Sequence, residues 1–310
     1  MRVATVDIGT NTVLLLVAEK RGRELVAVEE HATITRLGEG VDRTRTLHPD
    51  AIERTNACLE RYGEIVKRLG ATRVDVVGTS AMRDAKGSDA VRERVREALG
   101  VDARVISGDE EARLTFAGAL SGLGLDVGDG ELAVFDIGGG STEVVRGTLD
   151  AEGNVAAIAY AHSFDVGSVR MTERHVKSDP PTPAERDAVR ADLATTLATA
   201  PRLAKGSVPI GIAGTMTTLA AVALGMDAYD GARVHGHVMQ LAELIAVTDR
   251  MAAMPLAERR KLPGLEPKRA DVIVAGGLVA LAVLERMGAG SVRISDRGVR
   301  WGLAAKLAAS

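Results

Sequence analysis

The sequence predicts an α/β fold made of two copies of one plan, with a cleft between the copies. One observation is an internal repeat, in which RVATVDIGTNT at residues 2–12 corresponds to ELAVFDIGGGST at residues 131–142. In each copy an apolar run ends in Asp-Ile-Gly and a second apolar run follows, a pattern typical of strand, tight turn and strand. A third apolar run follows in both halves, at residues 25–37 and 155–164. Each half is therefore expected to begin with three antiparallel strands.

A second correspondence lies further along the chain. VDVVGTSAMRDA begins at Val74 and VPIGIAGTMTTLAAV begins at Val208, and both are typical of a strand, a Gly-Thr turn and a helix. Two correspondences in the same order arise by chance far less readily than one, so the whole domain is expected to be duplicated. In folds of this kind, ligands bind where strand ends and glycine turns converge.

Apolar residues near helical spacing predict the main helices, at residues 50–69, 90–99, 109–120, 183–200 and 241–254. The fourth of these should begin with a capping box, because Thr182 can accept from the backbone and Glu185 lies three positions later. Pro183 suits the first helical position.

Glycine is concentrated at residues 118–130, and the domain boundary is expected there. The first domain is then residues 1–122, joined by a C-terminal helix at residues 297–310 that crosses back to it. The second domain is residues 123–296.

Composition narrows the classes of partner. The 310-residue chain has 39 basic and 42 acidic residues, so its net charge of −3 gives no overall attraction to nucleic acid or to an anionic membrane. Aromatic residues make up 2% of the chain, which argues against a surface that stacks on bases.

The single cysteine, Cys58, cannot form an intramolecular disulfide, and the N-terminus has no features of a secretory signal, so a cytoplasmic protein is expected. The most apolar stretch, residues 272–284, is too short to span a bilayer.

The glycine turns are the candidate phosphate sites. In DIGTNT and DIGGGST, glycine lets the chain bend tightly and brings backbone N–H groups close to an anion. A single such turn more often merely joins two hairpin strands, but two matched copies favour phosphate binding. With the two Gly-Thr turns, the candidate residues are Gly9, Thr10, Asn11, Thr12, Gly138, Gly139, Gly140, Ser141, Thr142, Gly214 and Thr215.

Carboxylates beside these turns point to a divalent cation. Asp7 and Asp136 end their strands, and a carboxylate is a poor neighbour for phosphate unless a cation such as Mg²⁺ lies between them. Either aspartate could instead cap its own turn. Glu143 follows the second turn and suits water or metal binding as well as it suits a cross-strand charge pair. Asp136, Glu143 and Asp7 are therefore the candidate metal residues.

The stretch ISGDEEARL at residues 106–114 is typical of a strand end that enters a helix. Ser107 suits the N-cap, and Glu110 three positions later suits a capping box. Glu111 is rotated about 100° around the helix from Glu110, so its carboxylate is left for another task. The helix dipole favours its ionised form, which a general base requires. Spacing alone also allows an ordinary surface glutamate.

Arginines supply further candidates. Arg83 follows the first Gly-Thr turn by four residues, and its guanidinium would suit a pair of phosphate oxygens, or a salt bridge to Asp84 or Asp109. Weaker candidates of the same kind are Arg36, Arg170 and Arg297. The two histidines of VHGHV, at positions 235 and 237, have no third ligand nearby and form no metal motif.

Taken in order, eight segments resemble the motif series of the exopolyphosphatase and guanosine-pentaphosphatase family: DIGTNT, GTSAMRDA, SGDEEARL, DIGGGSTE, DVGSVRMTE, AGTMTTLAAV, RADVIVAGG and SDRGVRWGL. The resemblance covers residues 1–310. It implies two duplicated ribonuclease-H-like domains of the actin, sugar-kinase and heat-shock-chaperone type, flanking an active cleft.

The resemblance also implies roles for particular residues. Glu111 would be the catalytic base, Asp136 and Glu143 would position magnesium or water, and the glycine turns would bind phosphate. The chain departs from the family pattern at Thr12, where serine is usual, and at Met216, where a small residue is usual.

The expected activity is that of an exopolyphosphatase, which releases orthophosphate from the end of inorganic polyphosphate by in-line attack of a water activated by Glu111. Guanosine pentaphosphate is the alternative substrate, and a kinase of the same fold or a non-catalytic sensor is a weaker alternative. Because the sequence ends at Ser310, short polyphosphates are expected to be hydrolysed at least as efficiently as long ones. A homodimer is expected, and dimerisation could build a longer basic groove across two subunits.

Overall fold

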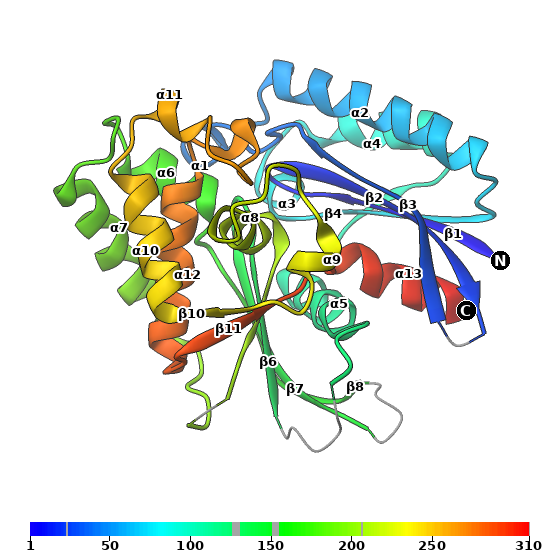
Figure 1. The fold of residues 1–310 in the computed structure, drawn as a ribbon. Helices are drawn as coiled ribbons and strands as arrows, with labels where there is room; N and C mark the ends of the chain where they lie inside the picture. Colours follow the sequence, from blue (N-terminus) through cyan, green and yellow to red (C-terminus); the bar gives the residue numbers. More distant parts are fainter. Residues whose placement is uncertain (23, 126–130, 151–154, 206, 310) are drawn as a thin grey trace. The chain divides into compact units, whose positions relative to one another are not determined.

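The computed structural model describes residues 1–22, 24–125, 131–150, 155–205 and 207–309. It divides into two compact units (Figure 1). Unit 1 comprises Met1–Gly118 and Val299–Ser310, and unit 2 comprises Ala119–Gly298. Of the glycine-rich stretch in which the boundary was expected, residues 126–130 lie outside the described residues, as does residue 310 at the end of the expected C-terminal helix.

The elements of unit 1 are β1 (Arg2–Ile8), β2 (Thr12–Arg21), β3 (Glu24–Ile34), α1 (Val41–Thr44), α2 (Pro49–Arg68), β4 (Arg73–Gly78), α3 (Ser80–Asp84), α4 (Ser88–Leu99), β5 (Ala103–Val105), α5 (Gly108–Leu120), whose last two residues pass into unit 2, and α13 (Val299–Ala309). The sheet order is β3-β2-β1-β4-β5. The first three strands are antiparallel neighbours, while β1, β4 and β5 run parallel. The three antiparallel strands expected at the start of the chain are confirmed.

Alternation along β1 explains why helices cover both faces of this sheet. Ala4, Val6 and Ile8 pack into the cluster under α2 and α4, whereas Val3 packs with α13 on the other face (Figure 1). Successive strand side chains point to opposite faces, so a strand buried on both sides reads as a continuous apolar run. Helix α13, at the end of the chain, therefore covers one face of the sheet that the first strands of the chain form.

The elements of unit 2 are β6 (Leu132–Ile137), β7 (Thr142–Leu149), β8 (Val155–Phe164), α6 (Ser168–His175), α7 (Pro183–Thr196), the 3₁₀ helix η2 (Leu197–Thr199), β9 (Ile210–Ile212), α8 (Ala213–Ala223), α9 (Gly231–Val234), β10 (Val238–Gln240), α10 (Leu241–Ala252), α11 (Leu256–Arg259), the 3₁₀ helix η3 (Pro267–Arg269), α12 (Ile273–Met287) and β11 (Ser291–Ile294). The sheet order is β10-β11-β9-β6-β7-β8.

The two sheets share one topology, which confirms the predicted duplication. In unit 2, β8-β7-β6 are antiparallel neighbours and β6, β9 and β11 run parallel, as β3-β2-β1 and β1, β4 and β5 do in unit 1. Strand β10 is an addition at the edge and pairs antiparallel with β11. The fold class is α/β with two mixed sheets.

The expected helices are present, with ends that differ by a few residues. The helix expected at residues 183–200 is α7 followed by a 3₁₀ turn, η2, at Leu197–Thr199. It begins with the predicted capping box, since Thr182 accepts from the Glu185 amide and the Glu185 carboxylate accepts from the Thr182 amide. Helix ends often tighten into a 3₁₀ turn, and apolar spacing does not distinguish that turn from an α-helix.

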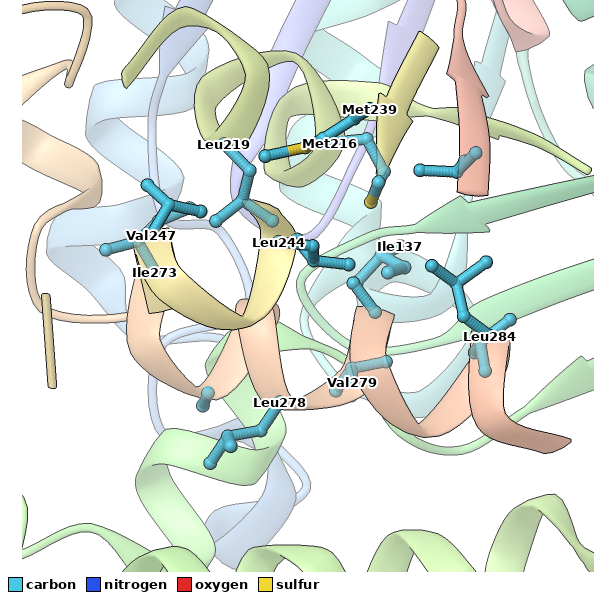
Figure 2. Packing of buried hydrophobic residues seen from close by; sticks show 14 of the residues in the cluster. Ile137, Met216, Leu219, Met239, Leu244, Val247, Ile273, Leu278, Val279 and Leu284 are labelled. Carbon is cyan, nitrogen blue, oxygen red and sulfur yellow. The ribbon is translucent and has the colours of Figure 1, made fainter. Parts of the chain in front are cut away.

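The core of unit 2 lies between its sheet and the helices α8, α10 and α12 (Figure 2). Ile137 of β6 lies in this cluster with Met216 and Leu219 of α8 and Leu244 of α10, and α12 adds Leu278 and Leu284 among others. The apolar stretch at residues 272–284 is thus buried inside a globular unit. Among the described residues, no helix is both long and apolar enough to cross a membrane.

Candidate active site

The first and second glycine turns are built by the same hydrogen bond. The Gly9 amide donates to the Thr12 carbonyl at 3.1 Å, and the Gly138 amide donates to the Ser141 carbonyl at 3.0 Å. Both bonds close a short turn between two antiparallel strands, β1 and β2 in one unit and β6 and β7 in the other. The sequence repeat therefore reflects a repeated local structure.

The first turn is fastened from its carbonyl side. The Asn11 carbonyl accepts from the amides of Thr35 and Arg36 at 3.1 and 3.0 Å, and the Thr10 carbonyl accepts from the Gly38 amide at 2.8 Å. The Thr10 hydroxyl lies 2.8 Å from the hydroxyl of Ser80 at the start of α3. This bond joins the first turn to the Gly-Thr turn that follows β4.

The second turn is fastened by the N-terminus of α6. The Gly138 carbonyl accepts from the Ser168 amide at 3.0 Å, and the Gly139 carbonyl accepts from the amides of Val169 and Arg170 at 2.9 and 3.0 Å. The guanidinium of the buried Arg170 donates through Nε to the Gly140 carbonyl at 2.6 Å. Arg170, one of the weaker phosphate candidates, thus holds the second turn in place through its Nε.

Binding these carbonyls leaves the amide side of both turns open. Within the described part of the chain, no acceptor receives a hydrogen bond from the amides of Gly139, Gly140 and Ser141, nor from those of Thr10 and Asn11. Backbone N–H groups almost always find a partner in folded proteins. Several neighbouring amides left open on a glycine turn form a concavity that suits an anion.

The third turn is the first turn of helix α8, Ala213–Thr215, and it lies beside the second. It follows β9, which is the parallel neighbour of β6, so their carboxyl ends lie at the same edge of the sheet. The Thr215 hydroxyl donates to the Ile137 carbonyl at 3.0 Å. Ala213 has a φ of 66°, a left-handed conformation that costs a non-glycine residue energy and is found mostly where function requires it.

Beside the third turn lies the guanidinium of Arg269, so close to Gly214 that a side chain at position 214 would collide with it. Burial lowers the pKa of this guanidinium. Gly214 is thus the residue that allows the arginine to approach the turn.

The two adjacent glutamates of α5, Glu110 and Glu111, have different surroundings in the structure. The Glu110 amide donates to the Ser107 hydroxyl at 3.1 Å, so Ser107 caps the helix. The Glu110 carboxylate lies in an exposed ion pair with Arg104 at 3.0 Å, which replaces the reciprocal half of the expected capping box. Glu111 is 7% exposed, so the rotation of about 100° between neighbouring helical positions does place it inward.

Arg83 is the partner that holds Glu111. Its Nη1 donates to the Glu111 carboxylate at 3.3 Å and to the Ile106 carbonyl at 3.1 Å, and its Nε lies 3.6 Å from Asp84. The alternative of a salt bridge to Asp84 is therefore present, together with a contact to Glu111 that the sequence did not suggest. A guanidinium with two donors on different groups fixes the direction of the carboxylate.

Asp136 and Glu143 lie directly opposite each other on β6 and β7. Like charges at such a pair are unfavourable unless a cation or a proton lies nearby, so the pair fits a divalent cation. Glu143 is fully buried and accepts from the Ser163 hydroxyl at 2.5 Å. No group of three or more His, Cys, Asp or Glu side chains suited to a metal occurs in the described ranges.

The remaining candidates lie as follows. Asp7 is a buried residue near the end of β1, in unit 1, whereas Asp136 and Glu143 belong to unit 2. Arg36 has a φ of 52° and donates its amide to the first turn. Arg297 donates to the Ser121 hydroxyl at 3.3 Å and packs against Gly122.

Sequence reasoning missed several supporting residues. Ser80 follows the Gly-Thr turn of GTS, which could have suggested a partner for Thr10. Ser163 faces Glu143 only because two irregularities shift the register of β7 and β8, and no sequence signal marks them. In VHGHV, Nδ1 of His235 lies 2.9 Å from the Asp296 carboxylate.

The whole chain resembles proteins of one family. Residues 16–310 match the model of the Ppx/GppA phosphatase family. Exopolyphosphatase 2 of Mycobacterium tuberculosis is 40% identical over 325 residues, which cover 99% of this chain and 98% of that protein.

Solved structures agree with this relationship. The Ppx/GppA enzyme of Aquifex aeolicus has a TM-score of 0.82 and 33% identity, covering 99% of each chain. The crystal structure of an exopolyphosphatase-like protein has a TM-score of 0.89 and 34% identity, covering 98% of this chain and 97% of that one. The fold is thus the actin-like type with two duplicated ribonuclease-H-like domains. On the extent of these matches, the chain belongs to the Ppx/GppA phosphatase family.

Proposed function

We propose that this protein is an exopolyphosphatase, which hydrolyses the terminal phosphoanhydride of inorganic polyphosphate and releases orthophosphate. The observation that carries the proposal is the pair of glycine turns whose carbonyls are bound by the protein and whose amides are left open among the described residues. Such turns suit the oxygens of a phosphate chain. The relationship to Exopolyphosphatase 2 supports the choice of substrate.

In this proposal the turns bind and orient the substrate. The binding residues are Gly9, Thr10, Asn11, Thr12, Arg83, Gly138, Gly139, Gly140, Ser141, Thr142, Gly214 and Thr215. The side chains of Thr10, Thr142 and Thr215 bond to the protein itself, so their contribution is to hold the turns in shape. The open amides then supply the direct hydrogen bonds, which strengthen as charge builds on the transferring phosphoryl group.

Glu111 is the proposed general base. Its carboxylate accepts the proton of the water that attacks the terminal phosphorus in line with the leaving oxygen. The contact with Arg83 at 3.3 Å aims the carboxylate, and burial keeps bulk water from competing with the reacting molecule.

Mg²⁺ is the proposed cofactor, held by Asp136 and Glu143 with Asp7 as a further candidate. When bound, it would neutralise charge on the phosphate oxygens. Ser163 fixes the Glu143 carboxylate and so determines which oxygen faces the substrate. We also propose that the protein is a cytoplasmic homodimer. Within each chain, we propose that the two units are the domains at residues 1–122 with 297–310 and at residues 123–296.

The second candidate substrate is guanosine pentaphosphate, because the family model covers Ppx and GppA proteins together. Its 5′ end presents the same terminal phosphoanhydride, so the same residues could serve both reactions.

Phosphate release tests these proposals. The purified protein is given tripolyphosphate, long-chain polyphosphate, guanosine pentaphosphate and ATP, each with Mg²⁺ and with a chelator, and orthophosphate is measured over time. We expect release from polyphosphate that requires Mg²⁺ and that Glu111→Gln abolishes. Release only from guanosine pentaphosphate would select the second candidate, and phosphate transfer to an acceptor would indicate a kinase. The mass of the protein by light scattering tests the homodimer.

A further inference from the structure

Three exposed cations of unit 1 lie on two segments that the backbone holds together. Arg43 and Arg45 lie at the end of α1, and Lys86 lies in the loop between α3 and α4. The Lys86 amide donates to the Arg45 carbonyl at 3.0 Å, and the Leu47 amide donates to the Lys86 carbonyl at 3.0 Å. We call Arg43, Arg45 and Lys86 the basic cluster.

The charges of the basic cluster are not used inside the protein. Within the described ranges, none of its three side chains forms an ion pair or a hydrogen bond. One neighbouring carboxylate, Asp84, already lies 3.6 Å from Nε of Arg83. Many arginines elsewhere in unit 1, such as Arg54 and Arg96, do pair with glutamate or aspartate. The charges of the basic cluster are therefore exposed and available to an anion.

The backbone at Arg45 is a second observation. Arg45 has a φ of 54°, a left-handed conformation that glycine adopts without cost and that arginine does not favour. This conformation ends α1 and turns the chain alongside Lys86, so the fold requires the conformation but not an arginine. A cationic side chain at a position suited to glycine points to a use for the charge.

The basic cluster is also tied to the proposed phosphate site. The segment that leads to α1 bonds to the first glycine turn through the Gly38 amide and the Thr10 carbonyl. On the other segment, Lys86 lies three residues after Arg83, at most about 10 Å of chain. Ser80 of the same short helix contacts Thr10. Both segments are therefore hydrogen-bonded to the first glycine turn, and the residues of the basic cluster follow a few positions later on each segment.

We propose that the basic cluster is a subsite for the internal phosphates of inorganic polyphosphate, beyond those bound at the glycine turns. This inference rests on the proposed function. A phosphoanhydride chain carries a charge on every unit, so each added cation raises affinity only for chains long enough to reach it. The cluster contributes to binding of the chain and not to the chemistry at its end. KM should therefore fall with chain length and then become constant once the cluster is covered, which reverses, up to that length, the expectation from the sequence that short chains are hydrolysed at least as efficiently as long ones.

The test compares the wild type with a triple variant, Arg43→Gln, Arg45→Gly and Lys86→Gln. Glycine at position 45 keeps the left-handed turn, so the variant should fold and melt as the wild type does. For long-chain polyphosphate we expect KM to rise roughly fivefold or more, with kcat changed less than twofold, since each exposed ion pair contributes a modest factor. For tripolyphosphate, KM should change by less than about twofold. The salt dependence of KM for the long chain should also become shallower.

The control is Arg92→Gln, which removes an exposed arginine of α4 and should leave KM unchanged for both substrates. An equal rise in KM for tripolyphosphate and long polyphosphate, or no rise for either, would overturn the subsite while leaving the exopolyphosphatase activity established. A rise confined to guanosine pentaphosphate would assign the cluster to a nucleotide. Absence of polyphosphate hydrolysis by the wild type would overturn the proposed function itself. That result is distinct from any difference between the wild type and the variants.

Discussion

At the scale of single residues, burial distinguishes two neighbours of the same chemistry. Glu110 forms an exposed ion pair with Arg104, and Glu111 is buried against Arg83. Taking a carboxylate out of water is costly unless a cation pairs with it, so the position of Glu111 has to be supported by the protein. A group held in this way is available to act on a water molecule without first rearranging.

Glu111→Gln is therefore expected to reduce kcat for polyphosphate by roughly a hundredfold or more, because the amide keeps the shape of the side chain and cannot accept the proton. Binding of polyphosphate, measured by calorimetry, should remain within a few-fold of the wild type. The matched control is Glu110→Gln, which removes an exposed pair and should leave turnover almost unchanged. A Glu111→Gln enzyme that retained more than about a tenth of wild-type kcat would show that another group is the base.

Sequence alone could distinguish Glu110 from Glu111, because the helical repeat fixes their angular offset. It could not show what faces each of them. The contact of Arg83 with Glu111 depends on how α3 and α5 are placed by the strands before them, over 28 residues of chain. Ser163 opposite Glu143 and His235 beside Asp296 are likewise set by strand register and loop path, which carry no local signal.

At the scale of elements, the second glycine turn and helix α6 are fitted to each other. Gly167 precedes α6, and a side chain on it would meet backbone atoms of Gly139 and Gly140 at 2.5 to 2.8 Å. Backbone atoms cannot move aside as a flexible side chain can. The turn and the helix N-terminus are thus held at a separation that only glycine permits.

Gly167→Ala should displace the second turn and lower both stability and phosphate release. We expect a loss of about 1–3 kcal/mol in the free energy of unfolding, as for overpacked sites, and a larger proportional loss of kcat/KM. Gly290→Ala is the matched control, because a side chain there would meet nothing within 4 Å, and the change should cost less than about 0.5 kcal/mol. Equal stability of the two variants would show that the turn tolerates the displacement.

The capping box of α7 gives a prediction on pH. Hydrogen bonds from the amides of Thr182 and Lys177 lower the pKa of Glu185 to about 2. Because the pKa is lower in the folded state, the stabilising contribution is present above the unfolded value of 4.5 and is lost as pH falls towards 2. Glu185→Gln should therefore melt below the wild type at pH 7, and the difference should shrink between pH 4.5 and 2. A difference in melting temperature that stayed constant over this range would contradict the assignment.

The helices and strands could largely be predicted, while their ends could not. Apolar periodicity located α2, α4, α5, α7 and α10 within a few residues, because each has one buried face. Short elements such as α1, α9 and β10 are three or four residues long and leave no periodic pattern. Their conformation is imposed by the elements around them.

At the scale of the whole molecule, duplication is the property that the sequence shows most clearly. The repeated Asp-Ile-Gly and Gly-Thr segments lie at equivalent places in two sheets of the same order. The copies differ in the helices around these segments and in the additional edge strand β10 of unit 2. The chain also returns at its end to unit 1, where α13 packs against β1 and β2.

The return of the chain makes the stability of unit 1 depend on its last helix. Leu303 of α13 is fully buried and packs with Val77 of β4, Ile106 and Leu114, so Leu303→Ala should lower the free energy of unfolding by about 2–5 kcal/mol. Trp301 is the single tryptophan of the chain and is buried in the same helix, so its fluorescence in a denaturant titration reports on this unit. Ala305→Gln, on the exposed side of α13, is the control and should shift the transition by less than about 0.5 kcal/mol. If both variants unfolded at the same denaturant concentration, α13 would not be part of the cooperative core. If only Leu303→Ala unfolds early, the last helix of the chain stabilises the sheet that carries the first glycine turn, as the bond from the Thr5 hydroxyl to the Arg300 carbonyl, 295 positions apart, also indicates.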